Sequence, residues 1–268
     1  MKLRYLGTAA AEGVPAVFCN CPQCEMARRA GGHEVRTRAG AIVDDCLKLD
    51  FGPDSYMQML RDGLRFYPVR NICITHTHED HFAYWDIQYR VKPYSQLPDD
   101  APPLTVWGNA RCGEMLAPFL EPGKLEFRLI EPFQPVDIDG YTVTALEAVH
   151  KRDERALFYL IEKDGKSLVY AHDTDEFTDA DMEYLAGRKV DVYSLDCTNG
   201  VLDLDYIGHM GLRDNQRMRE KLLANGAADA HTRFIANHFS HNGVRSIAEM
   251  QAFAPELEIA WDGLEVEI

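Results

Sequence analysis

The sequence predicts an α/β (α+β) fold in which two β-sheets pack face to face and helices cover their outer surfaces. Segments with strand character dominate both halves of the chain, and helical segments fall between them instead of forming a separate block. That pattern is typical of a layered sandwich. No internal repeat, low-complexity tract or linker divides the 268 residues. We therefore expect residues 1–268 to form one domain, which is a common size for a sandwich.

The strands are predicted from apolar runs of strand length and from the residues that end them. Residues 1–8 form such a run, and the segment 41–51 stops at Gly52-Pro53, a pair that breaks a strand. The apolar segment 69–75 is a buried strand that ends at a cluster of histidines. Later strands are expected at 104–107, 126–130, 141–149, 156–163, 167–172, 190–195, 234–236 and 257–266.

Helices and a loop are predicted between these strands. The helices cover residues 178–187, 212–225 and 243–253. The second of them ends near Asn225-Gly226, a pair that favours a helix C-terminus. The segment 93–103 is rich in proline and aspartate, so we expect it to be a loop.

Composition is that of a globular protein. Apolar residues make up 46% of the chain and charged residues 26%, which is ordinary for a domain with a sizeable core. No stretch approaches the roughly 20 apolar residues of a membrane helix, and the N-terminus turns polar too soon for a signal peptide. We therefore expect a cytoplasmic protein with no membrane partner.

The net charge of −15 restricts the partners further. The chain stays acidic even when three divalent ions and three thiolates are added to that count. Long nucleic acids owe most of their affinity to lysine and arginine, so we do not expect one as a partner. A small anionic substrate is compatible with this charge, because metal ions can reverse the local field at their site.

The strongest functional signal is the segment 76–81, His-Thr-His-Glu-Asp-His, directly after a buried strand. On a turn after a strand, alternate side chains can converge on one point. The imidazoles of His76 and His78 suit one metal ion, and the Asp80 carboxylate and the His81 imidazole suit a second. The glutamate of the segment is expected to point away. A chance cluster on a surface loop is the alternative, and four ligand-type residues at this spacing argue against it.

This segment resembles the HxHxDH signature of the metallo-β-lactamase superfamily. The resemblance implies a four-layer αββα sandwich with two divalent metal ions, zinc or manganese, whose remaining ligands follow later strands. His150, Asp173 and His238 match those ligands. The implied sets are His76, His78 and His150 for one metal, Asp80, His81 and His238 for the other, and Asp173 bridging both. Asp50 also matches a family position, and we interpret it as a residue that orients a ligand.

The cysteines predict a third metal. Seven cysteines, an odd number, argue against a disulfide framework. Cys19, Cys21 and Cys24 lie within six residues and are expected on one tight loop. Structural zinc normally has four ligands, and His241, three residues after His238, is the best candidate for the fourth. Buried thiols without a metal are the alternative.

Segments near the two ends of the chain resemble one particular family within this superfamily. The segments 6–8, 12–15, 27–29 and 261–265, together with the three clustered cysteines, are similar to the phosphoribosyl cyclic phosphodiesterases of the carbon–phosphorus lyase pathway, which degrades phosphonates. In that family a Cys3His zinc is structural. The similarity runs nearly end to end. It implies a small cyclic phosphate as the substrate, such as 5-phosphoribosyl 1,2-cyclic phosphate, and by analogy a homodimer.

The implied reaction is hydrolysis of a phosphodiester. Two metal ions hold phosphate oxygens and lower the pKa of bound water towards about 7, and the leaving alkoxide then needs a proton. His209 matches a family histidine that supplies this proton, and Asp196 is expected to orient the His209 ring. We also expect Asp80 to be a catalytic residue. A surface histidine without a catalytic role is the alternative for His209.

Several questions stay open at this point. The charged segment 151–155 borders the predicted site, where Arg152 or Arg155 either contacts a second phosphate or is simply solvated.

A ribonuclease Z-like nuclease would need a long Gly/Pro-rich arm, which this chain lacks. Proteins of pyrroloquinoline quinone formation share a similar cysteine-rich N-terminal region. A non-catalytic metal-binding protein of the same fold would be expected to have lost ligands.

Overall fold

Two seven-stranded sheets form the centre of the computed structural model, which describes residues 1–151, 153–204 and 208–268. The first sheet has the order β14 (Glu265–Glu267), β1 (Lys2–Gly7), β2 (Gly40–Val43), β3 (Leu47–Leu49), β4 (Asn71–Cys73), β5 (Leu104–Gly108) and β6 (Leu125–Leu129). The second has the order β13 (Glu258–Ile259), β12 (Arg233–Asn237), β11 (Val192–Asp196), β10 (Lys166–Ala171), β9 (Leu157–Lys163), β8 (Tyr141–Glu147) and β7 (Val136–Ile138).

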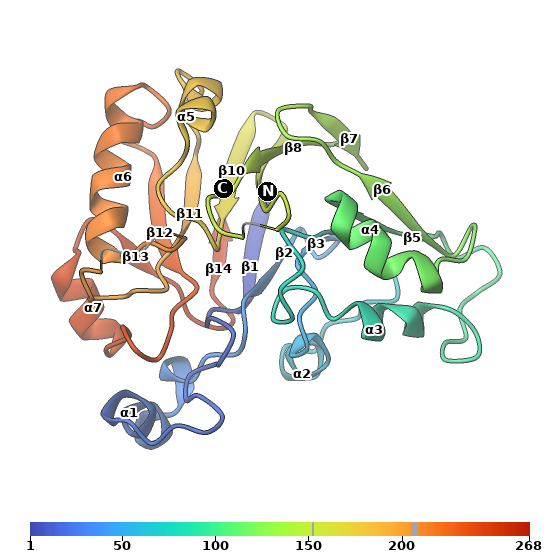
Figure 1. Ribbon diagram of the computed structural model, residues 1–268, viewed down its shortest axis with the longest axis horizontal. Helices are drawn as coiled ribbons and strands as arrows, with labels where there is room; N and C mark the ends of the chain where they lie inside the picture. Colours follow the sequence, from blue (N-terminus) through green and yellow to red (C-terminus); the bar gives the residue numbers. More distant parts are fainter. Residues whose placement is uncertain (152, 205–207) are drawn as a thin grey trace.

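Each sheet has a parallel part and an antiparallel part. Strands β3 to β6 pair in parallel in the first sheet, and strands β10 to β13 do so in the second. The remaining neighbours are antiparallel, including β1 and β14, which bring the two ends of the chain side by side (Figure 1). Because parallel strands end at the same edge of a sheet, the residues that follow them are gathered together.

Helices cover the outer face of each sheet. Figure 1 shows α3 (Tyr84–Ile87) and α4 (Ala110–Leu116) on the side of β5 and β6, and α5 (Asp179–Leu185), α6 (Leu212–Ala224) and α7 (Ile247–Phe253) on the side of β11 to β13. Helix α2 (Ser55–Arg61) follows β3, and α1 (Pro22–Ala30) projects from the lower edge of the view. Short 3-10 helices lie at Gly32–Glu34, Gln88–Arg90 and Ala117–Phe119.

The core has three apolar layers, as strand β9 illustrates. Leu157, Tyr159 and Ile161 pack between the two sheets, whereas Phe158 and Leu160 face the layer beneath α5, α6 and α7. A third layer lies between the first sheet and helices α3 and α4. Successive strand residues point to opposite faces, and both faces are apolar here because both are covered. The predicted four-layer αββα sandwich is therefore confirmed.

One predicted strand is wrong in a way that matters for the first sheet. The segment 41–51 is not one strand but the hairpin of β2 and β3. Asp44 and Asp45 have φ angles of 48° and 55°, in the left-handed region that aspartate tolerates better than most residues. The Asp44 carboxylate accepts hydrogen bonds from the Lys2 N–H at 2.7 Å and the Tyr141 hydroxyl at 2.6 Å. These bonds hold the turn.

The predicted closing strand 257–266 is also wrong, because its two halves belong to different sheets. Strand β13 joins the second sheet and β14 joins the first. Between them, Gly263 has a φ of 94°. The Asp262 carboxylate accepts hydrogen bonds from the Thr8 hydroxyl at 2.7 Å and the Thr37 N–H at 2.8 Å. The chain is thus bent where it passes from one sheet to the other.

The remaining boundaries differ less. The predicted helices 178–187 and 212–225 correspond to α5 and α6, but 243–253 becomes helical only at Ile247, because Ser246 caps α7. Helices α1 to α4, which span four to nine residues, were not predicted from the sequence. No helix in the described ranges is long and apolar enough to cross a membrane.

Helix α5 offers a test of the outer helix layer. The Thr178 hydroxyl accepts a hydrogen bond from the Asp181 N–H at 3.1 Å, and the Asp181 carboxylate accepts one from the Thr178 N–H at 3.0 Å. Thr178→Ala should lower the free energy of unfolding by about 1 kcal/mol, the usual cost of a lost N-cap. Denaturation by urea measures it. Glu183→Ala, on the exposed part of the same helix, is the control, and equal losses in both variants would contradict the prediction.

Candidate metal centres and active site

Strand ends from both sheets bring the predicted ligands together. The segment 76–81 follows β4 of the first sheet. His150, Asp173 and His238 follow β8, β10 and β12 of the second. The Leu157 N–H of β9 donates to the carbonyl of Thr75 at 2.9 Å, so the two sheets are joined directly beside this segment.

The first group of side chains contains three imidazoles and a carboxylate. His76 Nε2 lies 2.8 Å from His78 Nδ1, which lies 3.0 Å from His150 Nε2. Asp173 Oδ2 lies 3.3 Å from His76 Nε2 and 4.0 Å from His150 Nε2. One nitrogen or oxygen from each residue lies within 4.8 Å of the others. Imidazole and carboxylate donors that face one another in this way suit a divalent transition metal.

The second group shares Asp173 with the first. His81 Nε2 lies 2.7 Å from Asp173 Oδ2 and 3.2 Å from Asp80 Oδ2. His238 Nε2 lies 3.2 Å from His81 Nε2 and 3.8 Å from Asp80 Oδ2. All four side chains are buried. Asp173 belongs to both groups, which is the position that a bridging ligand requires.

The outward ring nitrogens are held by hydrogen bonds within the protein. His81 Nδ1 donates to Asp50 Oδ2 at 2.7 Å, and Asp50 Oδ1 accepts from the Thr75 N–H at 2.8 Å. His150 Nδ1 donates to the Gly208 carbonyl at 3.1 Å. Such partners fix the tautomer of each ring and direct the lone pair of the other nitrogen inward. Asp50 therefore lies behind His81, where it is placed to orient the ring, and is not a member of either ligand group.

Charge in the two groups also fits cations. Burial would raise the pKa of Asp80, but the adjacent His81 and a hydrogen bond from His238 outweigh burial and hold that pKa well below its ordinary value. Burial, with the neighbouring His81, lowers the pKa of His76 well below 6.5. Ionised carboxylates and neutral imidazoles are the states in which these side chains bind metals. Burial would lower the pKa of His81, but Asp80, Asp50 and Asp173 outweigh burial and raise that pKa well above 6.5. The carboxylates therefore hold positive charge at this point, which a divalent ion would supply in place of the imidazole proton, and the residues present fit two divalent ions.

The backbone is strained where these side chains are presented. Asp50, Asp173 and His238 have φ angles of 57°, 49° and 64°. Positive φ is uncommon for residues other than glycine, although aspartate and histidine are among those that adopt it most readily. The Asp173 N–H donates to Asp196 Oδ2 at 3.0 Å, which holds one of these turns. Strain of this kind concentrates at functional sites because the surrounding structure must maintain it.

His209 and Asp196 form a pair beside the shared carboxylate. His209 Nδ1 lies 3.2 Å from Asp196 Oδ2 and 3.4 Å from Asp173 Oδ1. Asp196 is fully buried, and its Oδ1 accepts from the Met210 N–H at 2.9 Å. Burial lowers the pKa of His209, but the charge of Asp196 and its hydrogen bond, with a contribution from Asp173, raise that pKa to about 9. The imidazole can therefore hold a proton next to the metal groups at neutral pH.

Thr198 is a site residue that the sequence did not point to. Its hydroxyl donates to Asp196 Oδ2 at 3.0 Å and lies 2.8 Å from His238 Nδ1. Thr198 thus connects Asp196, the partner of His209, to His238, a candidate metal ligand. Its one sequence signal is its position two residues after Asp196, directly beyond β11.

The clustered cysteines meet His241 as a separate group. Cys19 Sγ and Cys21 Sγ each lie 3.5 Å from His241 Nδ1, and His241 Nε2 lies 3.7 Å from Glu12 Oε1. Cys24 completes the set within 4.8 Å. The expected tight loop is only partly correct, because Cys21 precedes α1 and Cys24 lies in its first turn. The donor set of three thiols and an imidazole, with a carboxylate behind the imidazole, fits zinc.

A cleft of about 750 Å³ lies beside the two ligand groups. His78 and Asp80 form part of its wall, together with Arg38, Trp85 and Lys151. Glu79, which was expected to point away, also lines the cleft, so its wall carries both signs of charge. With metal ions to offset the carboxylates, the two cations and the aromatic ring suit an anionic substrate with an apolar part. Neither Arg38 nor Trp85 was predicted, because neither belongs to a sequence motif and only the fold brings them to the cleft.

The charged segment 151–155 is anchored at the same cleft. Lys151 Nζ donates to Glu154 Oε1 at 2.9 Å and to Thr77 Oγ1 at 3.0 Å. Glu154 also accepts from the Thr77 N–H at 3.0 Å. Arg155 is 58% exposed and pairs with two surface carboxylates, and Arg152 lies outside the described residues. Among the described residues of this segment, Lys151 is the one that lines the cleft.

Comparison with known proteins identifies the family and the fold. The model of the beta-lactamase superfamily domain matches residues 49–239. A coenzyme PQQ synthesis protein B of Methylobacterium sp. (strain 4-46) is 28% identical over 223 residues, which are 74% of this chain and 73% of that protein. The protein of the same name from Methylobacterium radiotolerans is 33% identical over 95 residues, and this chain spans only 32% of its length.

Solved structures share the whole architecture. A diphosphatase of the PhnP family has a TM-score of 0.78 at 22% identity, covering 100% of this chain and 97% of that one. Zinc-bound PqqB from Methylobacterium extorquens has a TM-score of 0.79 at 18% identity and is covered over its full length, 100% of each chain. The short form of human tRNase Z has a TM-score of 0.66 at 15% identity, covering 100% and 99%. At these identities the similarity shows the fold.

The cysteine group should bind one zinc ion independently of the other two groups. Cys24→Ser removes a fully buried thiol and should reduce bound zinc by one ion per chain, with a lower Tm. Plasma mass spectrometry of the dialysed protein measures the metal content. Cys46→Ser changes an exposed thiol outside the group and is the matched control. Unchanged zinc in Cys24→Ser would rule out this site.

Asp50 should influence metal affinity without touching the metal. Asp50→Asn keeps the shape of the side chain but removes the carboxylate that accepts from His81. Loss of such a partner usually weakens metal binding by about 10- to 100-fold. Competition with a chromophoric chelator measures the affinity, and Asp164→Asn, at an exposed turn, serves as the control. Equal affinities in the two variants would show that Asp50 does not orient a ligand.

Proposed function

Because this chain belongs to the beta-lactamase superfamily, we propose that it is a metal-dependent hydrolase that cleaves a small phosphodiester. The proposed substrate is a cyclic phosphate such as 5-phosphoribosyl 1,2-cyclic phosphate. We assign two divalent ions, zinc or manganese, to the groups that share Asp173, and a structural zinc to the cysteine group. The observation that carries the proposal is the pair of His209 and Asp196 beside these groups, with a 3.2 Å contact between them.

The reaction needs a nucleophile on one side of phosphorus and a proton on the other. Two divalent ions, when bound, would polarise phosphate oxygens and lower the pKa of a water molecule. The chain itself supplies the proton. As water attacks and the phosphorus–oxygen bond breaks, His209 protonates the leaving oxygen through Nε2, because Asp196 engages Nδ1. The proton that the attacking water loses passes to solvent, and solvent returns one proton to the imidazole, so the cycle consumes one water molecule.

The cleft supports a small anionic substrate. Arg38 and Lys151 line it together with the candidate ligands His78 and Asp80, and both cations can attract phosphate oxygens. Trp85 is 37% exposed and offers an apolar surface to a sugar or a similar group. The net charge of −15 of the whole chain opposes a long nucleic acid. The fold similarity to a diphosphatase of the PhnP family also supports phosphate ester chemistry.

A second candidate function is a step in the formation of coenzyme PQQ. It is favoured by the 28% identity over 223 residues to coenzyme PQQ synthesis protein B of Methylobacterium sp. (strain 4-46). The ligand groups described above would serve that function equally well. The two candidates differ in whether phosphodiesters are turned over, so the same assay separates them.

Two substrates with different leaving groups test the phosphodiesterase. The protein loaded with zinc or manganese should hydrolyse bis(p-nitrophenyl) phosphate and 5-phosphoribosyl 1,2-cyclic phosphate. His209→Ala should lower kcat on the cyclic phosphate by about 100-fold or more, since an alkoxide needs a general acid. The p-nitrophenolate ion needs no proton, so kcat on that substrate should fall much less.

The control is His231→Ala, which alters an exposed histidine and should leave both rates unchanged. Equal losses on both substrates in His209→Ala would remove the acid role of His209. Absence of turnover with either metal would reject the phosphodiesterase and favour the PQQ-related function.

A further inference from the structure

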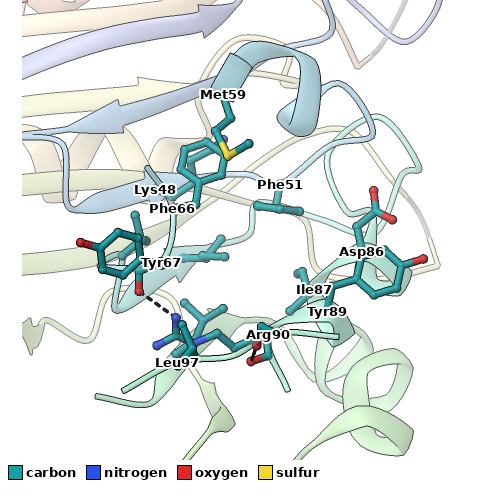
Figure 2. A pocket seen from close by; sticks show the side chains of 14 residues that line it. Lys48, Phe51, Met59, Phe66, Tyr67, Asp86, Ile87, Tyr89, Arg90 and Leu97 are labelled. Atoms are coloured by element: carbon teal, nitrogen blue, oxygen red, sulfur yellow. Dashed lines mark hydrogen bonds between the residues drawn. The ribbon is translucent and has the colours of Figure 1, made fainter. Parts of the chain in front are cut away.

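A second hollow lies on the outer face of the first sheet, away from the metal groups. Its volume is about 290 Å³, near the lower end of the range for small-molecule sites. Figure 2 shows Phe51, Phe66 and Ile87 around a common space, with Met59 projecting from α2 at its edge. Tyr67 and Tyr89, 55% and 50% exposed, also line the pocket. The pocket is mostly apolar, which suits a hydrophobic ligand.

A buried lysine interrupts this apolar lining. Lys48 belongs to β3 and is only 1% exposed, which is rare for lysine unless the charge is paired. Its Nζ donates to the carbonyls of Asp50 at 2.6 Å and Leu49 at 3.4 Å. No carboxylate forms an ion pair with Lys48 in the part of the chain that the structure describes. Its Nζ also lies 5.9 Å from the centre of the Phe51 ring. Two carbonyls use two of its three N–H donors, so one donor has no oxygen acceptor among the described residues.

Arg90 adds a second unsatisfied donor. It lines the same pocket, and its terminal nitrogens donate to the carbonyls of Tyr67 at 2.7 Å, drawn as a dashed line in Figure 2, and of Pro102 at 2.6 Å. Its Nε is buried and has no hydrogen-bond partner among the described residues. Asp86 is the carboxylate of this lining, and burial raises its pKa. The charge of the pocket is therefore weighted towards cations.

A buried cation without an ion-paired carboxylate is unfavourable, and the pKa of Lys48 reflects this cost. Burial lowers the pKa of Lys48 to about 8, although Asp50 opposes this shift. A bound anion would supply the missing partner and the missing acceptor together. The apolar surroundings would at the same time cover a hydrocarbon or an aromatic body.

We propose that this pocket is a binding site for a small amphipathic carboxylate, whose apolar body fills the space and whose carboxylate accepts a hydrogen bond from Lys48. The site is distinct from the metal cleft, although the two are neighbours. Phe51 and Asp86 line the pocket, whereas Pro53 and Trp85 line the cleft. Lys48 also bonds the carbonyl of Asp50, the residue that orients His81. A ligand bound to Lys48 would therefore be linked to the candidate metal centre through the hydrogen bond from Lys48 to the Asp50 carbonyl.

The test compares ligands with the same apolar body. Isothermal titration calorimetry of the metal-loaded protein with octanoate should show binding at least about tenfold tighter than with 1-octanol, the value of one charge-assisted hydrogen bond. Lys48→Met keeps the length and apolar character of the stem and should remove that preference. Lys124→Met, the same change at an exposed position, should retain it.

A second variant keeps the test independent of the stability of Lys48→Met. Met59→Trp fills the pocket from α2 and should abolish binding of both ligands without altering metal content. Octanoate that binds equally well to Lys48→Met and Met59→Trp would be located elsewhere, for example on the metal ions, and would overturn the proposal. Equal affinity of the wild-type protein for octanoate and 1-octanol, or no binding of either, would overturn it as well.

Discussion

Buried negative charge is the constraint on which the rest of this structure depends. Asp50, Asp173 and Asp196 are 3% exposed or less, and a buried charge without partners costs several kcal/mol. The fold meets this cost in two ways. The N–H groups of Thr75 and Asp173 at strand ends, and of Met210 before α6, donate to Asp50 or Asp196, and imidazoles gather around Asp173. The negative charge that is left is what divalent cations would neutralise, so folding and metal binding are coupled at this edge of the sheets.

The candidate structural zinc and the candidate catalytic centre share one segment of the chain. His238 and His241 are three residues apart after β12, and Phe239 between them lies fully buried beneath the Arg36 guanidinium at 4.5 Å. The Phe239 N–H donates to the carbonyl of Thr8 at 2.9 Å. The N-terminal region is thereby tied to the turn that presents His238. A zinc ion on the cysteines would brace that turn without contacting the other ligands.

Errors in the predicted elements have a common physical origin. The segment 41–51 and the segment 257–266 are both apolar enough for one strand each, but aspartates at 44, 45 and 262 introduce turns whose hydrogen-bond partners lie far along the chain. Local pattern cannot reveal a turn that is stabilised by Tyr141 or Thr8. The same holds for Trp85 and Arg38, which have no motif around them and face the cleft only because α3 and the region before β2 pack beside the segment 76–81.

Family resemblance supplied the later candidates His150, Asp173 and His238, whereas the sequence by itself determined the layered fold, the ligand-type residues of the segment 76–81 and the cluster of three cysteines. It could do so because strand period and ligand spacing are local properties that a single chain records directly. Only the tertiary structure decided which ring nitrogen of each histidine faces inward, that Asp173 reaches both groups, and that Lys48 lies in an apolar pocket with no carboxylate ion-paired to it among the described residues. These features depend on contacts between residues far apart in the chain, such as His81 with Asp173 and His150 with Gly208, and such contacts exist only after the two sheets have packed together.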